Sequence, residues 1–82
     1  MKKRFEYYII DKKLFALDTN SHFIVYWENG KWHEECNINE SVVIAYRSIE
    51  EAEAMKKTNE VSPLDYVEEL IEQDINKNIY CP

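Results

Sequence analysis

The chain has 82 residues, of which 45% are hydrophobic, 32% charged and 13% aromatic, and its formal net charge is −6. This length suits one domain, and the composition is too apolar for a disordered chain. One glycine and two prolines exclude collagen-like sequences and glycine-rich phosphate loops. The acidic balance disfavours binding to nucleic acid or to an anionic membrane, and no apolar run approaches the roughly 18 residues of a membrane helix.

The order of the patterns along the chain predicts an α+β fold. We expect one domain over residues 1–82, β-rich over about 1–47, helical over about 48–77, with a loose tail over 78–82 that only Tyr80 could anchor. An antiparallel sheet of four or five strands should come first, and two C-terminal helices should pack on one of its faces. Eight of the eleven aromatic residues precede residue 33, so the N-terminal half should supply most of the core.

The start of the chain indicates a cytoplasmic protein. Residues 1–4 are Met-Lys-Lys-Arg, which resembles the beginning of a signal peptide. Glu6 and Asp11 interrupt the apolar segment that would have to follow. We therefore expect an unprocessed cytoplasmic chain, in which Cys36 and Cys81 would be free thiols.

Three segments rich in aromatic and β-branched residues predict strands. They cover residues 5–10, 14–18 and 22–27. The turn between the first two lacks glycine, so its type stays open. A polar connector at residues 19–21 precedes the third strand.

Asn29-Gly30 is the strongest local signal, because both residues tolerate the positive φ of a two-residue hairpin turn. This turn would place Glu28 opposite Lys31 and Trp27 opposite Trp32, two favourable cross-strand pairs. One face of the hairpin should meet the core, with Phe23, Val25, Trp27, Trp32 and Cys36 on it.

Residues 42–46 form a nearly continuous apolar run, which favours a buried strand over a helix because of its β-branched residues. Ser48 and Glu51 match a capping box and predict the start of the first helix. That helix should end near Asn59, which tolerates a left-handed conformation.

Ser62-Pro63 predicts the start of the second helix, with serine as the cap and proline in the first turn. The apolar face of this helix would hold it on the sheet, with Leu64, Val67, Leu70, Ile71 and Ile75. Its opposite face, called the acidic face below, carries Asp65, Glu68, Glu69 and Glu72. Asp74 falls among the apolar residues, so the helix should fray or end near it.

The acidic face bears much of the net charge of the protein. Residues 48–82 hold nine acidic and three basic residues and account for the whole −6, and no base lies between residues 58 and 76. Four carboxylates over roughly 10 Å of helix approach the charge density of a nucleic-acid strand. One interpretation is a solvated surface that keeps the protein soluble. The other is a docking surface for a basic partner, because stabilising i, i+4 lysines are missing.

Residues able to support metal binding or catalysis are present but poorly spaced. His33 and Cys36 could ligate a metal with His22 and Cys81, or form a thiolate nucleophile. Alternation along a strand places His33 and Cys36 on opposite faces. We expect a half-exposed His33 near Tyr26, a buried Cys36, and no catalytic residues, metal or cofactor.

The sequence therefore predicts a small non-enzymatic binding protein that covers a basic protein surface. Its partner would be a nuclease or another nucleic-acid-binding effector, and it would be an inhibitor of the viral anti-defence or immunity type. Asp65, Glu68, Glu69 and Glu72 would make the contact. Two alternatives are a single-stranded nucleic-acid-binding module that uses the aromatic sheet, and a homodimer formed through a strand edge.

Overall fold

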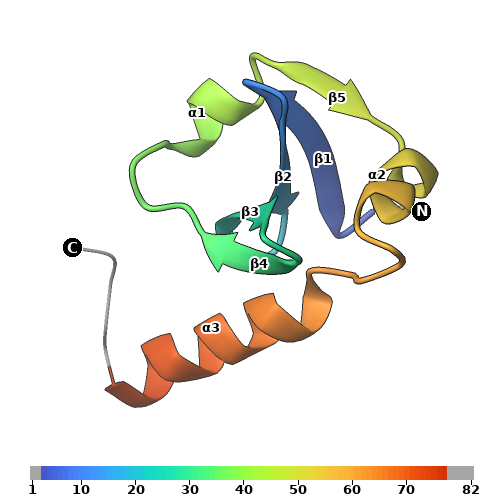
Figure 1. The fold of residues 1–82 in the computed structure, drawn as a ribbon. Coiled ribbons are helices and arrows are strands. Elements are labelled where there is room, and N and C mark those ends of the chain that lie inside the picture. The colour runs from blue at the N-terminus through green and yellow to red at the C-terminus, as the bar shows by residue number, and fades with distance from the viewer. Residues whose placement is uncertain (1–2, 78–82) are drawn as a thin grey trace.

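The computed structural model describes residues 3–77, the last four of them through their backbone alone. The described chain folds into a five-stranded antiparallel sheet of order β4-β3-β2-β1-β5, followed by C-terminal helices (Figure 1). The strands are β1 (Phe5–Ile10), β2 (Lys13–Asp18), β3 (Ile24–Glu28), β4 (Lys31–Glu34) and β5 (Arg47–Ile49). The helices are α1 (Glu40–Val43), α2 (Glu51–Lys57) and α3 (Leu64–Lys77). The predicted α+β class is confirmed.

The first two strands meet in a tight turn whose type the sequence left open. Ile10 pairs with Lys13, so the connection has two residues, Asp11 and Lys12. Both have positive φ, 51° and 66°, as a type I′ turn requires. The right-handed twist of the strands favours this turn even without a glycine.

The hairpin predicted at Asn29-Gly30 is confirmed with its register. Both turn residues have positive φ, 55° and 74°, and Glu28 pairs with Lys31. Trp27 and Trp32 face each other, with ring centroids 5.3 Å apart in an edge-to-face arrangement. This geometry favours aromatic pairs and fixes the pairing of β3 with β4.

The strand predicted over residues 42–46 is wrong. The Asn39 side chain accepts a hydrogen bond from the Val42 amide at 3.1 Å and caps the short helix α1. Of the apolar residues in this run, Val43 is fully buried, whereas Val42, Ile44 and Tyr46 are 42–54% exposed. The fifth strand is instead β5, which pairs with β1.

The capping box predicted at Ser48 is also wrong. Ser48 pairs with Tyr8 inside the sheet, so it cannot begin a helix. Helix α2 begins after Glu50, which makes no side-chain capping bond. The predicted end is confirmed, because α2 stops at Lys57 and Asn59 has a φ of 54°.

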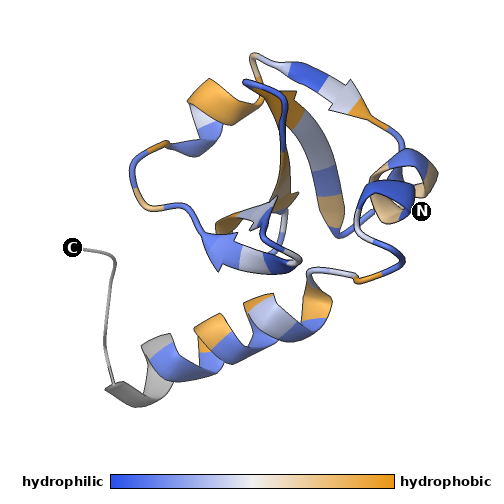
Figure 2. Ribbon diagram, viewed as in Figure 1, coloured by the Kyte–Doolittle hydropathy of each residue, from blue (hydrophilic) through white to orange (hydrophobic). Residues whose placement is uncertain are grey.

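The sheet has a core on each face. Helices α2 and α3 pack on the first face, to which the β3–β4 hairpin also contributes. The buried cluster on this face consists of Phe5, Tyr7, Leu14, Ala16, Val25, Trp32, Ala54 and Val67. Helix α1 covers the second face, through the cluster Tyr8, Ile10, Phe15, Leu17, Ile24 and Val43. Hydrophobic residues recur along α1 and α3 beside the strands (Figure 2). The two C-terminal helices thus cover one face, as predicted, and α1 is an unpredicted cover for the other.

Helix α3 ends at Lys77, which agrees with the predicted helical range of about 48–77, and it continues through Asp74, near which the sequence suggested fraying or an end. A single polar residue in an apolar arc does not end a helix whose preceding turns are already packed on the sheet. The predicted tail over residues 78–82, including Tyr80, lies outside the described residues.

Candidate protein-binding surface on helix α3

Helix α3 begins as its sequence predicts. The hydroxyl oxygen of Ser62 accepts a hydrogen bond from the Leu64 amide at 3.1 Å. Pro63 follows, fully buried, and its carbonyl accepts from the Val67 amide at 2.9 Å. Serine satisfies a free amide at the helix start, and proline lacks the amide that would need a partner there.

The helix is fastened to the sheet by its first turns. Val67 is fully buried, and Tyr66, Leu70 and Ile71 pack half-buried against the same cluster. Just before the helix, the Val61 carbonyl accepts a hydrogen bond from Nε1 of Trp32 at 3.0 Å. This bond joins the segment preceding α3 to strand β4 and fixes the entry of the helix.

Not every residue of the predicted apolar face of α3 is buried against the sheet. Leu64 is 38% exposed, so the expectation that it holds the helix on the sheet is wrong. Tyr66 takes this role instead, because it packs partly buried against the same cluster. The side chain of Ile75 lies outside the described part of the structure.

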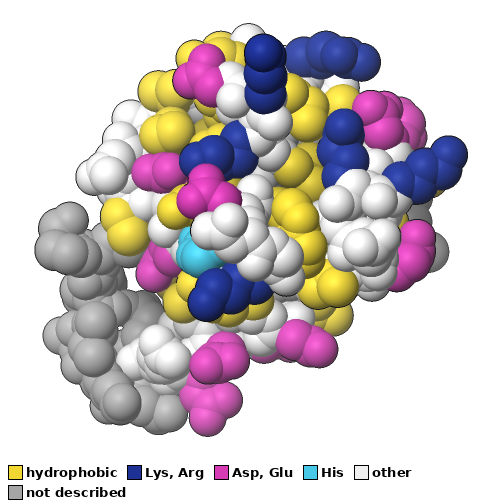
Figure 3. Space-filling view, viewed as in Figure 1, with side chains coloured by type: hydrophobic (Ala, Val, Ile, Leu, Met, Phe, Trp, Pro, Cys, Tyr) yellow, Lys and Arg dark blue, Asp and Glu magenta, His cyan; other side chains and the backbone are white. Residues whose placement is uncertain are grey.

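All four residues of the acidic face lie at the surface. Asp65, Glu68, Glu69 and Glu72 are exposed, and Figure 3 shows acidic side chains gathered along the lower edge of the molecule, over α3. Glu68 differs from the others, because one of its oxygens lies 3.8 Å from Nη2 of Arg4. The face is therefore exposed as predicted, but one of its four charges is partly neutralised.

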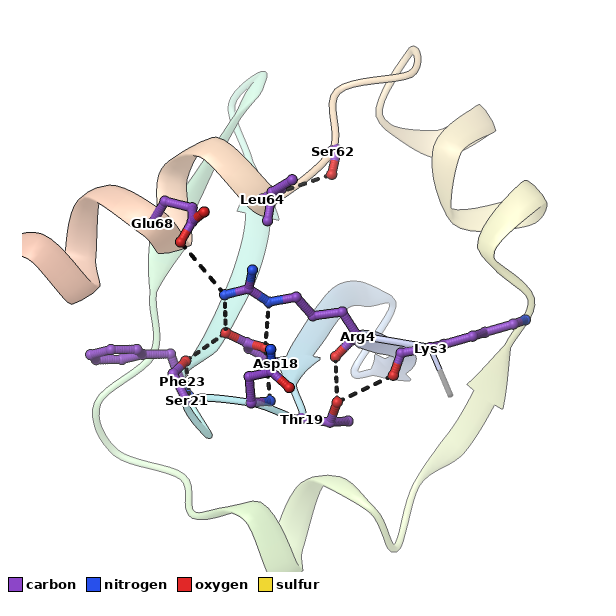
Figure 4. Close-up of polar contacts among 10 residues, drawn as sticks. Lys3, Arg4, Asp18, Thr19, Ser21, Phe23, Ser62, Leu64 and Glu68 are labelled. Carbon is purple, nitrogen blue, oxygen red and sulfur yellow. Dashed lines mark hydrogen bonds and ion pairs between the residues drawn. The ribbon is translucent and has the colours of Figure 1, made fainter. Parts of the chain in front are cut away.

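Arg4 is placed beside Glu68 by a buried carboxylate (Figure 4). Asp18 is fully buried and accepts two hydrogen bonds from Arg4, both at 3.0 Å. It also accepts from the Ser21 hydroxyl at 2.6 Å and from the Asn20 amide at 3.0 Å. Burial alone would raise the pKa of Asp18, but these hydrogen bonds and the positive charge of Arg4 outweigh it and lower the pKa.

A groove of about 460 Å³ lies between the β3–β4 hairpin and α3. We call it the hairpin–helix groove; its lining residues are Gly30, Lys31, Trp32, His33, Val61, Ser62, Asp65, Tyr66 and Glu69. Burial raises the pKa of the Tyr66 hydroxyl, against an opposing hydrogen bond with the Glu34 backbone. Two carboxylates of the acidic face thus share a hollow with aromatic side chains, which the sequence did not predict.

The histidines are engaged with neighbours. His33 stacks on Tyr26 with centroids 5.2 Å apart, as expected, and its Nε2 lies 2.9 Å from the Glu28 carbonyl oxygen. His22 Nδ1 lies 2.6 Å from a carboxylate oxygen of Glu40. Among the described side chains, no group of three or more His, Cys, Asp or Glu residues gathers to hold a metal ion.

Cys36 differs from its prediction. It is exposed rather than buried, and it is disulfide-bonded rather than a free thiol. It lies in the polar segment after β4, outside the pleat that would have turned it to the core. Cys81, the other cysteine of the chain, lies outside the described residues.

The aromatic residues that could stack nucleic-acid bases are in the cores. Tyr7, Tyr8 and Phe15 are 3%, 7% and 4% exposed. Base stacking needs an open aromatic face, so these three rings offer none. Lys3 and Lys12 lie beyond opposite ends of β1, so the basic residues that precede and follow this strand do not form one patch.

Protein-family models, curated proteins and solved structures were compared with this chain, and none of them matches it. None of the helices in the described part of the chain is long and apolar enough to span a bilayer. The charges, aromatic rings and geometry of the acidic face and the adjoining groove are therefore the basis for a functional hypothesis.

Proposed function

We propose that this protein is a non-enzymatic inhibitor that binds the basic surface of a nuclease or another nucleic-acid-binding effector, as viral anti-defence and immunity proteins do. The observation that carries the proposal is the exposure of all four carboxylates of the acidic face on one helix. The carboxylates would occupy positions that otherwise receive phosphates. A surface of one charge also accelerates encounter with its opposite.

The fastening of α3 supports the proposal because it presents the charges on a rigid element. Val67 is buried and Trp32 is bonded to Val61, so the first turns have a fixed position on the sheet. A preorganised surface loses less conformational entropy on binding than a flexible one. The buried positions of Tyr7, Tyr8 and Phe15 also favour protein binding over the alternative of base stacking.

The test is a variant whose acidic face carries no charge, Asp65→Asn with Glu68→Gln, Glu69→Gln and Glu72→Gln, called the four-charge variant below. Its association with a set of purified basic nucleases is measured at two salt concentrations, beside association with single-stranded DNA. We expect the wild type to bind and inhibit a nuclease, and the variant to associate roughly ten-fold more slowly at low salt. The salt dependence should flatten, because screening acts over roughly 8–10 Å.

A matched control removes the same number of charges elsewhere. Glu50, Glu51, Glu53 and Glu60 are all exposed, and their change to Gln alters the net charge equally. If the control slows association as much as the α3 variant, only the net charge matters. If neither variant changes binding, the acidic face is a solvated surface and the proposal fails.

The cytoplasmic location predicted from the sequence remains part of the proposal, because the effectors that it would inhibit act there. The disulfide at Cys36 points toward an oxidising compartment instead. Alkylation of thiols in intact producing cells, followed by mass spectrometry, decides between them. If the reagent modifies Cys36 in the cells, its thiol is free and the cytoplasmic location is supported. If Cys36 is recovered unmodified in its disulfide, the cytoplasmic location is excluded.

A second candidate function is homodimerisation, which is favoured by the sheet edge at β5. Val42, Ile44 and Tyr46 are exposed and immediately precede β5, an edge strand of the sheet. Apolar side chains beside an unpaired strand edge suit pairing with a second copy. Sedimentation equilibrium of the wild type and of Ile44→Lys tests this: a dimer that the substitution dissociates supports it, and a wild-type monomer at all concentrations overturns it.

A further inference from the structure

The hairpin–helix groove has two walls that the fold holds at a fixed spacing. Strand β4 supplies Trp32 on one side, and the first two turns of α3 supply Tyr66 on the other. The bond from Trp32 Nε1 to the Val61 carbonyl, 3.0 Å long, joins the walls at one end. Trp32 is buried by this packing, so its ring is fixed in place and does not move freely in solvent.

The groove combines carboxylates with aromatic rings. Asp65 and Glu69 lie one helical turn apart, so their side chains are neighbours on α3. Within the described side chains neither of them forms an ion pair, whereas Glu68 is paired with Arg4. Trp32 is 5% exposed and offers no open face, so the half-buried ring of Tyr66 supplies the aromatic surface that a cation can reach. Aromatic faces attract cations, and a pair of carboxylates attracts them further.

We propose that the hairpin–helix groove binds the guanidinium of an arginine from the partner protein, an inference that rests on the proposed function and deepens it. A guanidinium is planar, stacks on aromatic faces and donates several hydrogen bonds to carboxylates. Lysine has a compact, strongly hydrated charge and fits such a groove less well. The groove is open and adjoins the acidic face, so an arginine on a docked basic surface would reach it directly.

Lys31 also lines the groove and provides a sharp test. It lies at the hairpin tip, exposed, where its positive charge would repel an arriving guanidinium. Removing that charge should strengthen binding, which a purely structural role for the groove would not explain. Asp65 and Glu69 should act in the opposite direction.

The experiment uses the full chain, labelled with ¹⁵N, and a capped Gly-Arg-Gly peptide at constant ionic strength. The indole N–H signal of Trp32 reports on the groove. The backbone amide signal of Leu17, which belongs to the cluster on the second face of the sheet, is the internal reference. We expect a saturable shift at Trp32 with the arginine peptide and none with its neutral citrulline counterpart. The matching lysine peptide should bind more weakly.

Three variants distinguish the groove from the rest of the acidic face. Asp65→Asn with Glu69→Gln should weaken the dissociation constant of the arginine peptide by roughly five-fold or more, and Lys31→Gln should tighten it about two- to three-fold. Glu68→Gln with Glu72→Gln, the matched control, should leave it within about two-fold. Unchanged NMR spectra away from the substitutions verify that each variant is folded.

The outcomes separate this inference from the proposed function. The groove is not an arginine site if the citrulline peptide shifts Trp32 equally, if no shift saturates, or if the two double variants weaken binding equally. If the peptide fails to bind while the four-charge variant still slows nuclease association, the proposed function stands without the groove. If the peptide binds but the four-charge variant associates normally, the groove stands and the proposed function fails.

Discussion

Asp18 is the buried carboxylate that joins the start of β1 to the end of β2. It accepts two hydrogen bonds from Arg4, and Arg4 in turn reaches Glu68 on α3. A buried charge is costly unless it is fully hydrogen-bonded, and here four donors supply the bonds. Asp18 therefore has a structural role that also positions a basic residue beside the acidic face.

Asp18→Asn should lower the free energy of unfolding by about 1–3 kcal/mol, because the amide keeps the shape but loses the charge-assisted bonds. The measurement is urea denaturation at pH 7. The control is Glu50→Gln, which breaks an exposed ion pair with Lys3, with both side chains more than half exposed, and should change stability by less than about 0.5 kcal/mol. Equal effects of the two substitutions would contradict the structural role of Asp18.

The same carboxylate predicts a pH dependence of stability. The pKa of Asp18 is lowered in the folded protein, so the folded state binds fewer protons at this site than the unfolded state. The stabilisation is therefore complete above about pH 4, the pKa of an unfolded aspartate, and is lost as the pH falls through the lower folded pKa. Wild type should lose more stability than Asp18→Asn between pH 5 and about pH 2. Parallel losses in both proteins would contradict this.

Cys36 predicts a response to reductant that the sequence alone did not suggest. A disulfide stabilises a small domain mainly by restricting the unfolded chain, typically by about 2–4 kcal/mol. Dithiothreitol should lower the melting temperature of the wild type by several degrees and leave that of Cys36→Ser unchanged. A chelator should affect neither protein. A wild type that melts identically with and without reductant would show that Cys36 contributes nothing.

At the scale of elements, the two tight turns of the sheet differ in a way that predicts opposite mutational effects. Lys12 and Gly30 hold the same second position of a two-residue turn, with φ of 66° and 74°. A lysine is strained at positive φ and a glycine is not. An added Cβ at Gly30 would meet no atom within 4 Å, so any penalty there is conformational rather than steric.

Lys12→Gly should stabilise the protein by roughly 0.5–1 kcal/mol, and Gly30→Val should destabilise it by at least about 1 kcal/mol. Thermal and urea unfolding of both variants measure these changes. Lys31→Gly, outside the strained positions, is the control and should not stabilise. If Lys12→Gly destabilises, the β1–β2 turn does not have the positive-φ conformation.

The elements that the sequence could predict are those decided by local chemistry. Asn29-Gly30 fixed the hairpin and its register, and Ser62-Pro63 fixed the start of α3, because each signal acts within a few residues. Helix α1 and strand β5 could not be predicted in this way. Residues 42–46 lack a helical period, and only Val43 packs on the second face of the sheet. Ser48 has a good capping sequence but lies where β1 needs a partner.

The same distinction between local sequence signals and long-range contacts applies to the candidate site. The period of α3 predicted that Asp65, Glu68, Glu69 and Glu72 share an exposed face. The pairing of Glu68 with Arg4 was not predictable, since their positions are set by the whole sheet. Trp32 and Val61, which form the groove, are 29 residues apart in the chain. Such long-range contacts have no local signature in a single sequence.

In the whole molecule, the two halves of the chain supply different parts of the structure. The sheet and both cores come mainly from the neutral N-terminal half, while the acidic C-terminal half supplies the helices of the first face. In Figure 3 one basic side chain lies just above the acidic lower edge, and the others lie in the upper part of the view among further acidic side chains. Residues 48–82 carry the whole net charge of −6, and this charge would orient α3 toward a basic partner during approach.

The last prediction tests whether the two faces are independent cores. Val43 and Val67 are both fully buried, but they belong to clusters on opposite faces of the sheet. Val43→Ala and Val67→Ala should each lower the free energy of unfolding by roughly 1–3 kcal/mol, through lost burial and the cavity left behind. Because the two residues belong to separate clusters, the double variant should equal the sum within about 0.5 kcal/mol. Val25 belongs to the cluster of Val67, so Val25→Ala combined with Val67→Ala should deviate more from additivity. Urea unfolding of all five variants measures these sums. If Val43→Ala and Val67→Ala couple more strongly than the pair within one cluster, the sheet does not insulate its faces, and changes under α1 would then reach the acidic face of α3.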